Sequence, residues 1–102
     1  MKWDKQEEVR RFVESNNLEG ETAYRLLDLV SEVGEVVKDA TKSADYGNSK
    51  EDLEVKEDEI GDVLFSLLTV CNDLDIDPEK SLETALEKYE DRIDEKGDPS
   101  SK

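Results

Sequence analysis

The sequence contains no histidine and a single cysteine, Cys71, among its 102 residues. Histidine is the most common general base, so in its absence proton transfer falls to a carboxylate or to metal-activated water. One cysteine excludes an intramolecular disulfide and agrees with a reducing compartment such as the cytoplasm. Cys71 has apolar neighbours and no histidine to activate its thiol, so we predict a core residue rather than a nucleophile.

Basic residues are scarce as well: 14 Lys and Arg stand against 29 Asp and Glu, a formal net charge of −15. A surface of this sign neither neutralises the phosphates of nucleic acid nor favours an anionic membrane. A small phosphate ligand remains possible if a divalent cation separates it from the carboxylates. The acidity by itself is equally compatible with a solvated surface in a salty cytoplasm.

Long apolar runs are missing too. The longest, Ile60 to Cys71, is interrupted by polar residues and is too short to span a bilayer. The segment Met1 to Glu8 is charged and has no apolar core of a signal peptide. We therefore expect a cytoplasmic protein that binds neither membranes nor nucleic acid polymers.

Only 34% of the residues are apolar, and 42% are charged. A chain of this length buries only about 60–65% of its unfolded surface, so a monomer with so few apolar side chains would be marginally stable. Association through a helical face would supply the missing burial. We therefore expect a homo-oligomer.

Apolar residues recur at helical spacing in four segments, and no strand pattern competes with them. The sequence therefore predicts an all-α fold with a single domain over residues 1–97 and a frayed tail over residues 98–102. The predicted helices run from about Asp4 to Asn16, from Thr22 to Ser43, from Ser49 to Leu74, and from Pro78 to the stop at Gly97.

Two of these helices differ in their apolar pattern. The third is apolar nearly all round its axis from Ile60 onward, which predicts burial on more than one side. The second has one main stripe, which Leu29 and Val36 widen. The main stripe consists of Ala23, Leu26, Leu27, Val30, Val33 and Val37.

Acidic residues three apart are common in this chain, but two pairs share a further pattern. The segments Glu32 to Glu35 (EVGE) and Glu59 to Asp62 (EIGD) both read acid, β-branched residue, glycine, acid, and both lie inside apolar runs. A glycine inside a helix costs about 1 kcal/mol relative to alanine. Its use at equivalent positions in both segments favours close backbone approach or room for a ligand.

Each acid pair lies on one helix face, with Cβ atoms about 5–6 Å apart. If the two helices face each other, four carboxylates meet, and they cannot all stay ionised without cations such as Mg²⁺. Asp62 has apolar residues on both flanks and no evident solvent-facing position. Glu32 and Glu35 point away from the main stripe, so alone they would be interpreted as surface residues.

The two acid pairs and their surroundings resemble the MazG-like all-α nucleotide pyrophosphohydrolases. Leu26 to Val37 (LLDLVSEVGEVV) resembles the first metal-binding helix of that family, and Glu59 to Leu68 (EIGDVLFSLL) resembles the second. Cys71 to Arg92 resembles the stretch that follows, so the likeness covers about Tyr24 to Arg92.

The resemblance implies a four-helix bundle completed by oligomerisation into a dimer or tetramer. It also implies hydrolysis of a nucleoside triphosphate, or of its deoxy form, to the monophosphate and pyrophosphate. Glu32, Glu35, Glu59 and Asp62 match the catalytic Mg²⁺ ligands of the family, and Mn²⁺ is an alternative cation. Many relatives carry a second acid just before the first motif glutamate, where this chain has Ser31.

Five further residues are candidate substrate contacts. Lys88 and Arg92 are spaced i, i+4 beside Tyr89 and could clamp phosphate oxygens, although ordinary ion pairs with neighbouring acids explain them equally well. Lys38, one turn after the first acid pair, is a similar candidate. Asn72 could contact sugar or base, with helix capping or solvation as the simpler interpretation.

Three functions are compatible with these features of the sequence. The first is a MazG-like pyrophosphohydrolase that acts on canonical or modified nucleotides. The second is a phosphoribosyl-ATP pyrophosphohydrolase, which shares the fold and the acidic helices. The third is a non-catalytic acidic module that binds divalent ions or a partner helix. The paired glycines and Asp62 argue against the third, and the segment DIDPE after the second acid pair favours the first.

Overall fold

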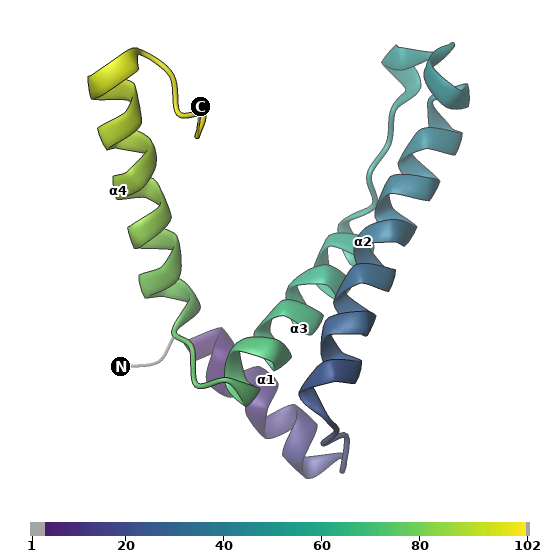
Figure 1. The fold of residues 1–102 in the computed structure, drawn as a ribbon. Helices are drawn as coiled ribbons and strands as arrows, with labels where there is room; N and C mark the ends of the chain where they lie inside the picture. The colour runs from purple at the N-terminus through teal and green to yellow at the C-terminus, as the bar shows by residue number, and fades with distance from the viewer. Residues whose placement is uncertain (1–3, 102) are drawn as a thin grey trace.

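The computed structural model describes residues 4–101. None of the helices in this part of the chain is both long enough and apolar enough to cross a membrane, and no strand occurs in it, so the expected all-α class is confirmed. Two single 3-10 turns, η1 (Asp45–Gly47) and η2 (Lys50–Asp52), separate the second and third helices. The α-helices are α1 (Asp4–Ser15), α2 (Thr22–Ser43), α3 (Glu57–Asp73) and α4 (Pro78–Lys96) (Figure 1).

Local sequence sets both ends of α4. Asp77 accepts hydrogen bonds from the backbone N–H groups of Glu79 (3.0 Å) and Lys80 (3.2 Å), and Pro78 occupies the first helical position. Gly97 follows the last turn with φ at 86°, a left-handed conformation that glycine adopts without a steric penalty. The predicted limits of this helix are confirmed.

The third helix starts later than the sequence predicts. A helix is expected from Ser49, but α3 begins only at Glu57. After the single turn of η2 the backbone is extended at Leu53 and Lys56, with ψ at 126° and 138°. The prediction is wrong because the segment is mostly charged and its apolar Leu53 and Val55 stay exposed, so no buried face holds it as a helix.

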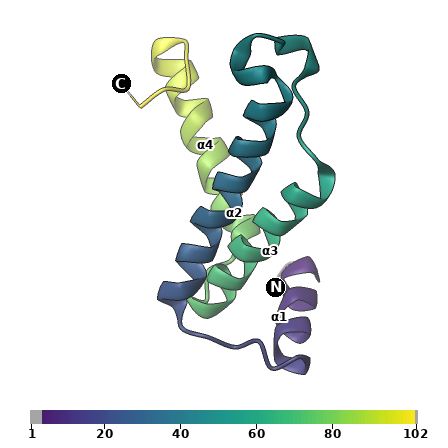
Figure 2. The ribbon, with the colours of Figure 1, turned by 90° about the vertical axis from the view of Figure 1, so that its right-hand side faces the viewer.

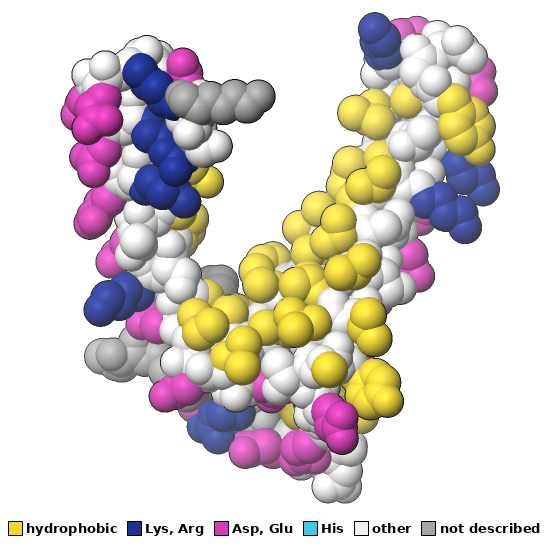
Figure 3. All heavy atoms as spheres, viewed as in Figure 1, with side chains coloured by type: hydrophobic (Ala, Val, Ile, Leu, Met, Phe, Trp, Pro, Cys, Tyr) yellow, Lys and Arg dark blue, Asp and Glu magenta, His cyan; other side chains and the backbone are white. Residues whose placement is uncertain are grey.

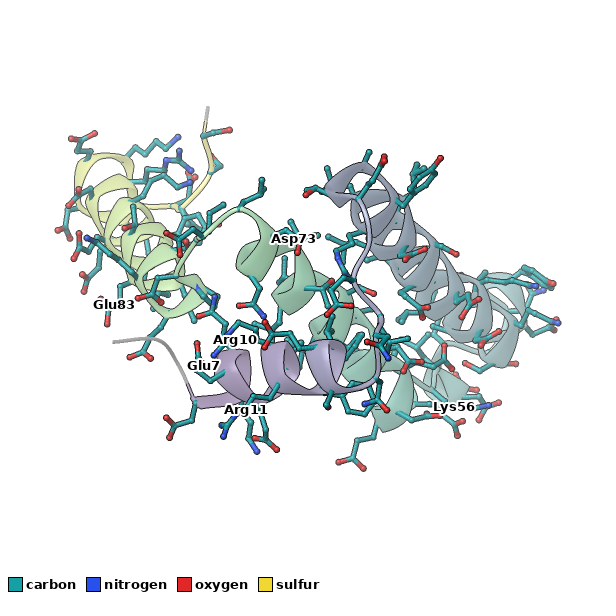
Figure 4. All side chains as sticks on the ribbon, turned by 90° about the horizontal axis from the view of Figure 1, so that it is seen from below. Glu7, Arg10, Arg11, Lys56, Asp73 and Glu83 are labelled. Carbon is teal, nitrogen blue, oxygen red and sulfur yellow. The ribbon has the colours of Figure 1, made fainter. Side chains whose placement is uncertain are left out.

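α2 and α3 pack side by side and antiparallel, and we call their contact the α2–α3 seam (Figures 1 and 2). At one end, Arg25 Nε of α2 forms an ion pair of 2.8 Å with Asp73 Oδ2 of α3, which is labelled in Figure 4. At the other end, Ser43 Oγ accepts a hydrogen bond of 2.8 Å from the backbone N–H of Glu54. These contacts fix the register of the two helices.

α1 crosses α3 on another side. The rings of Phe12 and Phe65 meet edge to face, with centroids 5.9 Å apart. Gln6 is completely buried and donates from Nε2 to the carbonyl oxygen of Ile76 (2.9 Å). Asn72 donates in turn to the carbonyl oxygen of Gln6 (3.2 Å). α3 therefore lies between α1 and α2, as its apolar sequence predicts.

α4 diverges from α2 and α3, so the chain has the outline of a V (Figure 1). The radius of gyration is 16.9 Å, whereas a compact domain of this length has about 13 Å. The described residues of one chain therefore do not close a four-helix bundle. One chain therefore shows the predicted helices but not their closed arrangement as a bundle.

The face of α2 that packs on α3 is not the main apolar stripe. Leu29, Glu32, Val36 and Ala40 are half-buried toward α3, whereas Val30 remains 70% exposed. Figure 3 shows apolar side chains gathered on the faces of α2 and α3 that look toward α4. The strongest apolar stripe of the sequence is therefore left uncovered within one chain. Its large exposed members are Leu26, Leu27, Val30, Val33 and Val37.

Candidate functional site

Glu32 of the first acid pair lies on the face of α2 that packs toward α3, and its side chain is half-buried. Partial burial raises the pKa of its carboxyl above the usual range, and the negative charges of Glu35, Asp62 and Asp28 raise it further. Asp62 exerts this effect from the opposite helix. The antiparallel register therefore brings a member of one acid pair close to a member of the other.

Glu59, the other acid of the second pair, lies further along the α2–α3 seam and is also half-buried. Burial is the main cause that raises the pKa of its carboxyl. The charge of Asp39 and a hydrogen bond between the two carboxyl groups raise it further. Lys56, labelled in Figure 4, acts in the opposite direction. Oε2 of Glu59 is buried and has no hydrogen-bond partner. This carboxyl is therefore poorly compensated.

Asp39 lies outside the EVGE and EIGD segments, although its position in the sequence carries a signal. Asp39 stands four residues after Glu35 and seven after Glu32, so all three lie on one face of α2. The three-residue spacing of acids within apolar runs identifies only the EVGE and EIGD segments and does not include Asp39. The face of α2 extends one turn beyond the first pattern.

The remaining two acids of the pairs, Glu35 and Asp62, are exposed. The expectation that Asp62 has no solvent-facing position is wrong for the single chain. Ile60 and Leu64, which flank it on α3, are themselves 45% and 46% exposed, so this side of the helix faces solvent. Apolar neighbours in sequence bury an acid only when another helix covers them.

The four carboxylates of the acid pairs do not form one tight cluster. Among residues 4–101, no group of three or more Cys, Asp or Glu side chains is close enough to hold a metal ion as placed. The site is instead drawn out along the seam, with Glu32 facing Asp62 and Glu59 facing Asp39. The donor chemistry is nevertheless uniform, since every group is a carboxylate.

The glycines of the two acid segments border open space. A Cβ atom added to Gly34 or Gly61 would meet nothing within 4 Å. Close backbone approach within one chain therefore does not explain them. Gly61 also borders a groove of about 660 Å³ between α1 and α3, which Phe12, Leu64 and Phe65 line.

Three of the predicted substrate contacts lie on α4. Lys88 Nζ and the Arg92 guanidinium carbon stand 5.4 Å and 6.0 Å from the centre of the Tyr89 ring, a cation–π arrangement. Arg92 also donates to the carbonyl oxygen of Pro99 (3.2 Å). Figure 3 shows a row of Lys and Arg side chains along this helix. These residues are together, but α4 diverges from the seam that holds the acids.

The other two predicted contacts have different surroundings. Lys38 is exposed on α2, one turn after the first acid pair. Asn72 donates a hydrogen bond to the carbonyl oxygen of Gln6 and so ties α3 to α1. Cys71 is buried next to it, and burial raises the pKa of its thiol, which agrees with the predicted core role.

The family model of the MazG nucleotide pyrophosphohydrolase domain matches residues 21–96 of this chain. The matched region includes α2, α3 and α4 and therefore both acid segments. Comparisons with curated proteins and with solved structures gave no match. Since the family model covers most of the chain, the protein belongs to the MazG nucleotide pyrophosphohydrolase family.

Proposed function

We propose that this chain is a Mg²⁺-dependent enzyme that hydrolyses a nucleoside triphosphate to the monophosphate and pyrophosphate. The observation that carries the proposal is the packing of α2 against α3, the two helices with the acid pairs, which lets the charge of Asp62 act on Glu32. A cation bound between carboxylates on facing helices would offset their mutual repulsion. The membership in a nucleotide pyrophosphohydrolase family supports a phosphate substrate at that cation.

Mg²⁺ fits the residues present. Mg²⁺ prefers hard oxygen ligands, and the buried Oε2 of Glu59 lacks a partner that a cation would provide. Glu32, Glu35, Glu59 and Asp62 would hold the ion, and Mn²⁺ would be accepted by the same oxygens. When bound, the cation supplies positive charge to the phosphate oxygens and lowers the pKa of a nearby water.

The chain itself must accept the proton of the attacking water. No histidine is present, so a carboxylate of the seam takes this role. The expected consequence is a rate that rises with pH until this acceptor is ionised.

The proposed enzyme is an oligomer of this chain. The single chain exposes 7818 Å², whereas a compact monomer of 11.6 kDa exposes about 5,800 Å². The excess of about 2,000 Å² is larger than the roughly 800 Å² that each partner buries in a standard interface. The uncovered apolar faces of α2 and α3 favour a second copy as the cover, which would place its helices inside the V.

Assembly would also bring the basic residues of α4 into the site. Lys88 and Arg92 lie on the arm of the V that diverges from their own α2–α3 seam (Figure 1). A second copy seated between the arms would present its acids to this helix. We therefore assign Lys88, Tyr89 and Arg92 to the substrate phosphates or base of a neighbouring copy, and Lys38 to the phosphates held by its own chain.

The experiment that tests the function is a pyrophosphate-release assay on the full chain. The panel contains the ribo- and deoxynucleoside triphosphates and phosphoribosyl-ATP, each with Mg²⁺, with Mn²⁺ and with chelator. We expect cation-dependent pyrophosphate from at least one nucleoside triphosphate. The nucleotide that reacts fastest then identifies base and sugar preference.

Two results would contradict the proposal. Pyrophosphate from phosphoribosyl-ATP alone would move the assignment to that other class of pyrophosphohydrolase. No product from any substrate, with protein shown by circular dichroism and light scattering to be folded and assembled in low and in molar salt, would favour a non-catalytic acidic module.

A further inference from the structure

A pocket of about 370 Å³ lies at the end of the α2–α3 seam, beyond the meeting point of Glu32 and Asp62. Lys42 and Ser43 follow the first acid pair on α2, and Glu54 and Lys56 stand in the segment before α3. The remaining two are Asp39 and Glu59, which contact each other across the seam. The complete lining is Asp39, Lys42, Ser43, Glu54, Lys56 and Glu59.

The contact between Asp39 and Glu59 joins two groups of like charge. The negative charge of Asp39, which is exposed, acts on the carboxyl of Glu59, which is half-buried there. Lys56 is the cation that acts on Glu59, but it is exposed, and its charge does not outweigh burial and Asp39. Two carboxyl groups in such contact need either a shared proton or a cation between them.

The position of one oxygen favours the cation. Oε2 of Glu59 is shielded from solvent, and no N–H or O–H group of the described residues donates a hydrogen bond to it. A divalent cation can bind several carboxylate oxygens at once. Asp39 also continues the acid face of α2, one turn beyond Glu35.

We infer that Asp39 is a further ligand of the divalent cation and holds it together with Glu59 at the end of the seam. This inference rests on the proposed function, because it extends the same cation site. It adds a carboxylate that lies outside the EVGE and EIGD segments. The site would then follow the seam over about two turns of α2.

The test is a titration of the full-length, assembled protein with Mg²⁺ alone by isothermal calorimetry, repeated with Mn²⁺ by electron paramagnetic resonance. Asp39→Asn is compared with Asp58→Asn. Asp58 is exposed on α3, and its charge also acts on Glu59, so the control removes equal charge without removing the contact. We expect Asp39→Asn to weaken cation binding by roughly ten-fold or more and Asp58→Asn to change it far less.

A second measurement separates a ligand from a structural residue. Without cation, Asp39→Asn replaces a repulsive contact by an amide that can donate to Glu59, so the variant should unfold at the same temperature as wild type or higher. With saturating Mg²⁺, wild type should gain thermal stability and Asp39→Asn should gain much less. A merely structural aspartate would lower the unfolding temperature in both conditions.

The outcomes distinguish this inference from the proposed function. Equal cation affinities of the two variants would overturn the role of Asp39 and leave the four-carboxylate site standing. An unfolding temperature of Asp39→Asn below wild type in chelator, with an unchanged gain in Mg²⁺, would overturn it as well. Failure of wild-type protein to bind either cation would overturn the proposed cation site itself.

Discussion

Asp62 is the residue through which α3 acts on the first acid pair. Asp62→Asn keeps the size of the side chain and removes its charge. If Asp62 is a ligand of the catalytic cation, kcat/KM should fall by roughly 100-fold or more. The helical content should stay unchanged, because the side chain is exposed. Pyrophosphate release in saturating Mg²⁺ and far-ultraviolet circular dichroism measure the two quantities.

The matched control for this substitution is Glu57→Gln. Glu57 is an exposed acid in the first turn of the same helix and lies outside the proposed ligand set. The Glu57→Gln variant should retain the activity of wild type. An Asp62→Asn protein with full activity would remove Asp62 from the site.

The raised pKa of Glu32 predicts a pH dependence of stability in metal-free protein. Because this pKa is higher in the folded than in the unfolded chain, the folded chain binds the proton more tightly. The resulting stabilisation is complete below the unfolded pKa of about 4.3 and is lost as pH rises through the folded value. Above that value the charged carboxylate destabilises the fold.

Glu32→Gln tests this dependence, since the amide does not titrate. At neutral pH in chelator the variant should unfold at a higher temperature than wild type, and the difference should shrink as pH falls toward 4. Thermal unfolding curves between pH 4 and 8 measure it. Parallel curves at every pH would show that Glu32 is not destabilised by its charged neighbours.

At the scale of single elements, the cap of α4 gives a quantitative expectation. The Asp77 carboxylate accepts from two backbone N–H groups that otherwise lack a partner. Asp77→Ala should lower the free energy of unfolding by about 0.5–2 kcal/mol. Asp91→Ala, at an exposed position inside the same helix, should change it much less. Urea unfolding of both variants at equal chain concentration decides between a capping role and a mere loss of charge.

Element boundaries are predictable here wherever local chemistry decides them. Asp77, Pro78 and Gly97 fix the limits of α4 through hydrogen bonds and backbone conformation that depend only on neighbouring residues. Apolar periodicity places α2 at Thr22–Ser43, and no side-chain cap precedes this helix. The prediction fails from Ser49 onward, because a charged segment forms a helix only if other elements cover one face, and sequence periodicity does not reveal that cover.

Which face of a helix packs inside the chain is harder to predict than where the helix lies. The sequence identifies the EVGE and EIGD segments as a pair, and the structure brings Glu32 and Asp62 together. The helical spacing of α2, however, predicts that the stripe with Val30 is buried in the core. In the structure, the side with Leu29 and Glu32 packs on α3 instead. Both sides are apolar enough to be covered, and only one is covered within a single copy.

At the scale of the whole molecule, the uncovered stripe and the V outline belong together. A chain with only 34% apolar residues gains little folding stability if many of them stay in contact with water. The apolar faces of α2 and α3 look toward α4, across a space that another copy can enter (Figure 3). Since α4 also carries the basic row, assembly would complete the apolar core and the charge balance of the site at once.

Val30→Glu tests this assembly at the most exposed of the large apolar residues of the stripe. Val30 is 70% exposed in one chain, so a glutamate there would be harmless if the chain worked alone. If a second copy covers the stripe, the substitution buries an unpaired charge in the interface. The mass measured by light scattering should then fall toward 11.6 kDa, and pyrophosphate release should be lost together with the assembly.

Ser31→Glu provides the comparison, because it adds the same charge at the adjacent, exposed position beside the stripe. Both masses are measured in chelator, since Ser31 adjoins the acids of the seam. If both variants keep the mass of wild type, the stripe does not form the contact between copies. Suppose that Val30→Glu dissociates whereas Ser31→Glu does not, and that mixing Val30→Glu with an Asp62→Asn chain restores neither assembly nor activity. The stripe must then be intact on both partners. That result would identify the apolar face of α2 as a surface shared symmetrically between copies, on which the acid site depends.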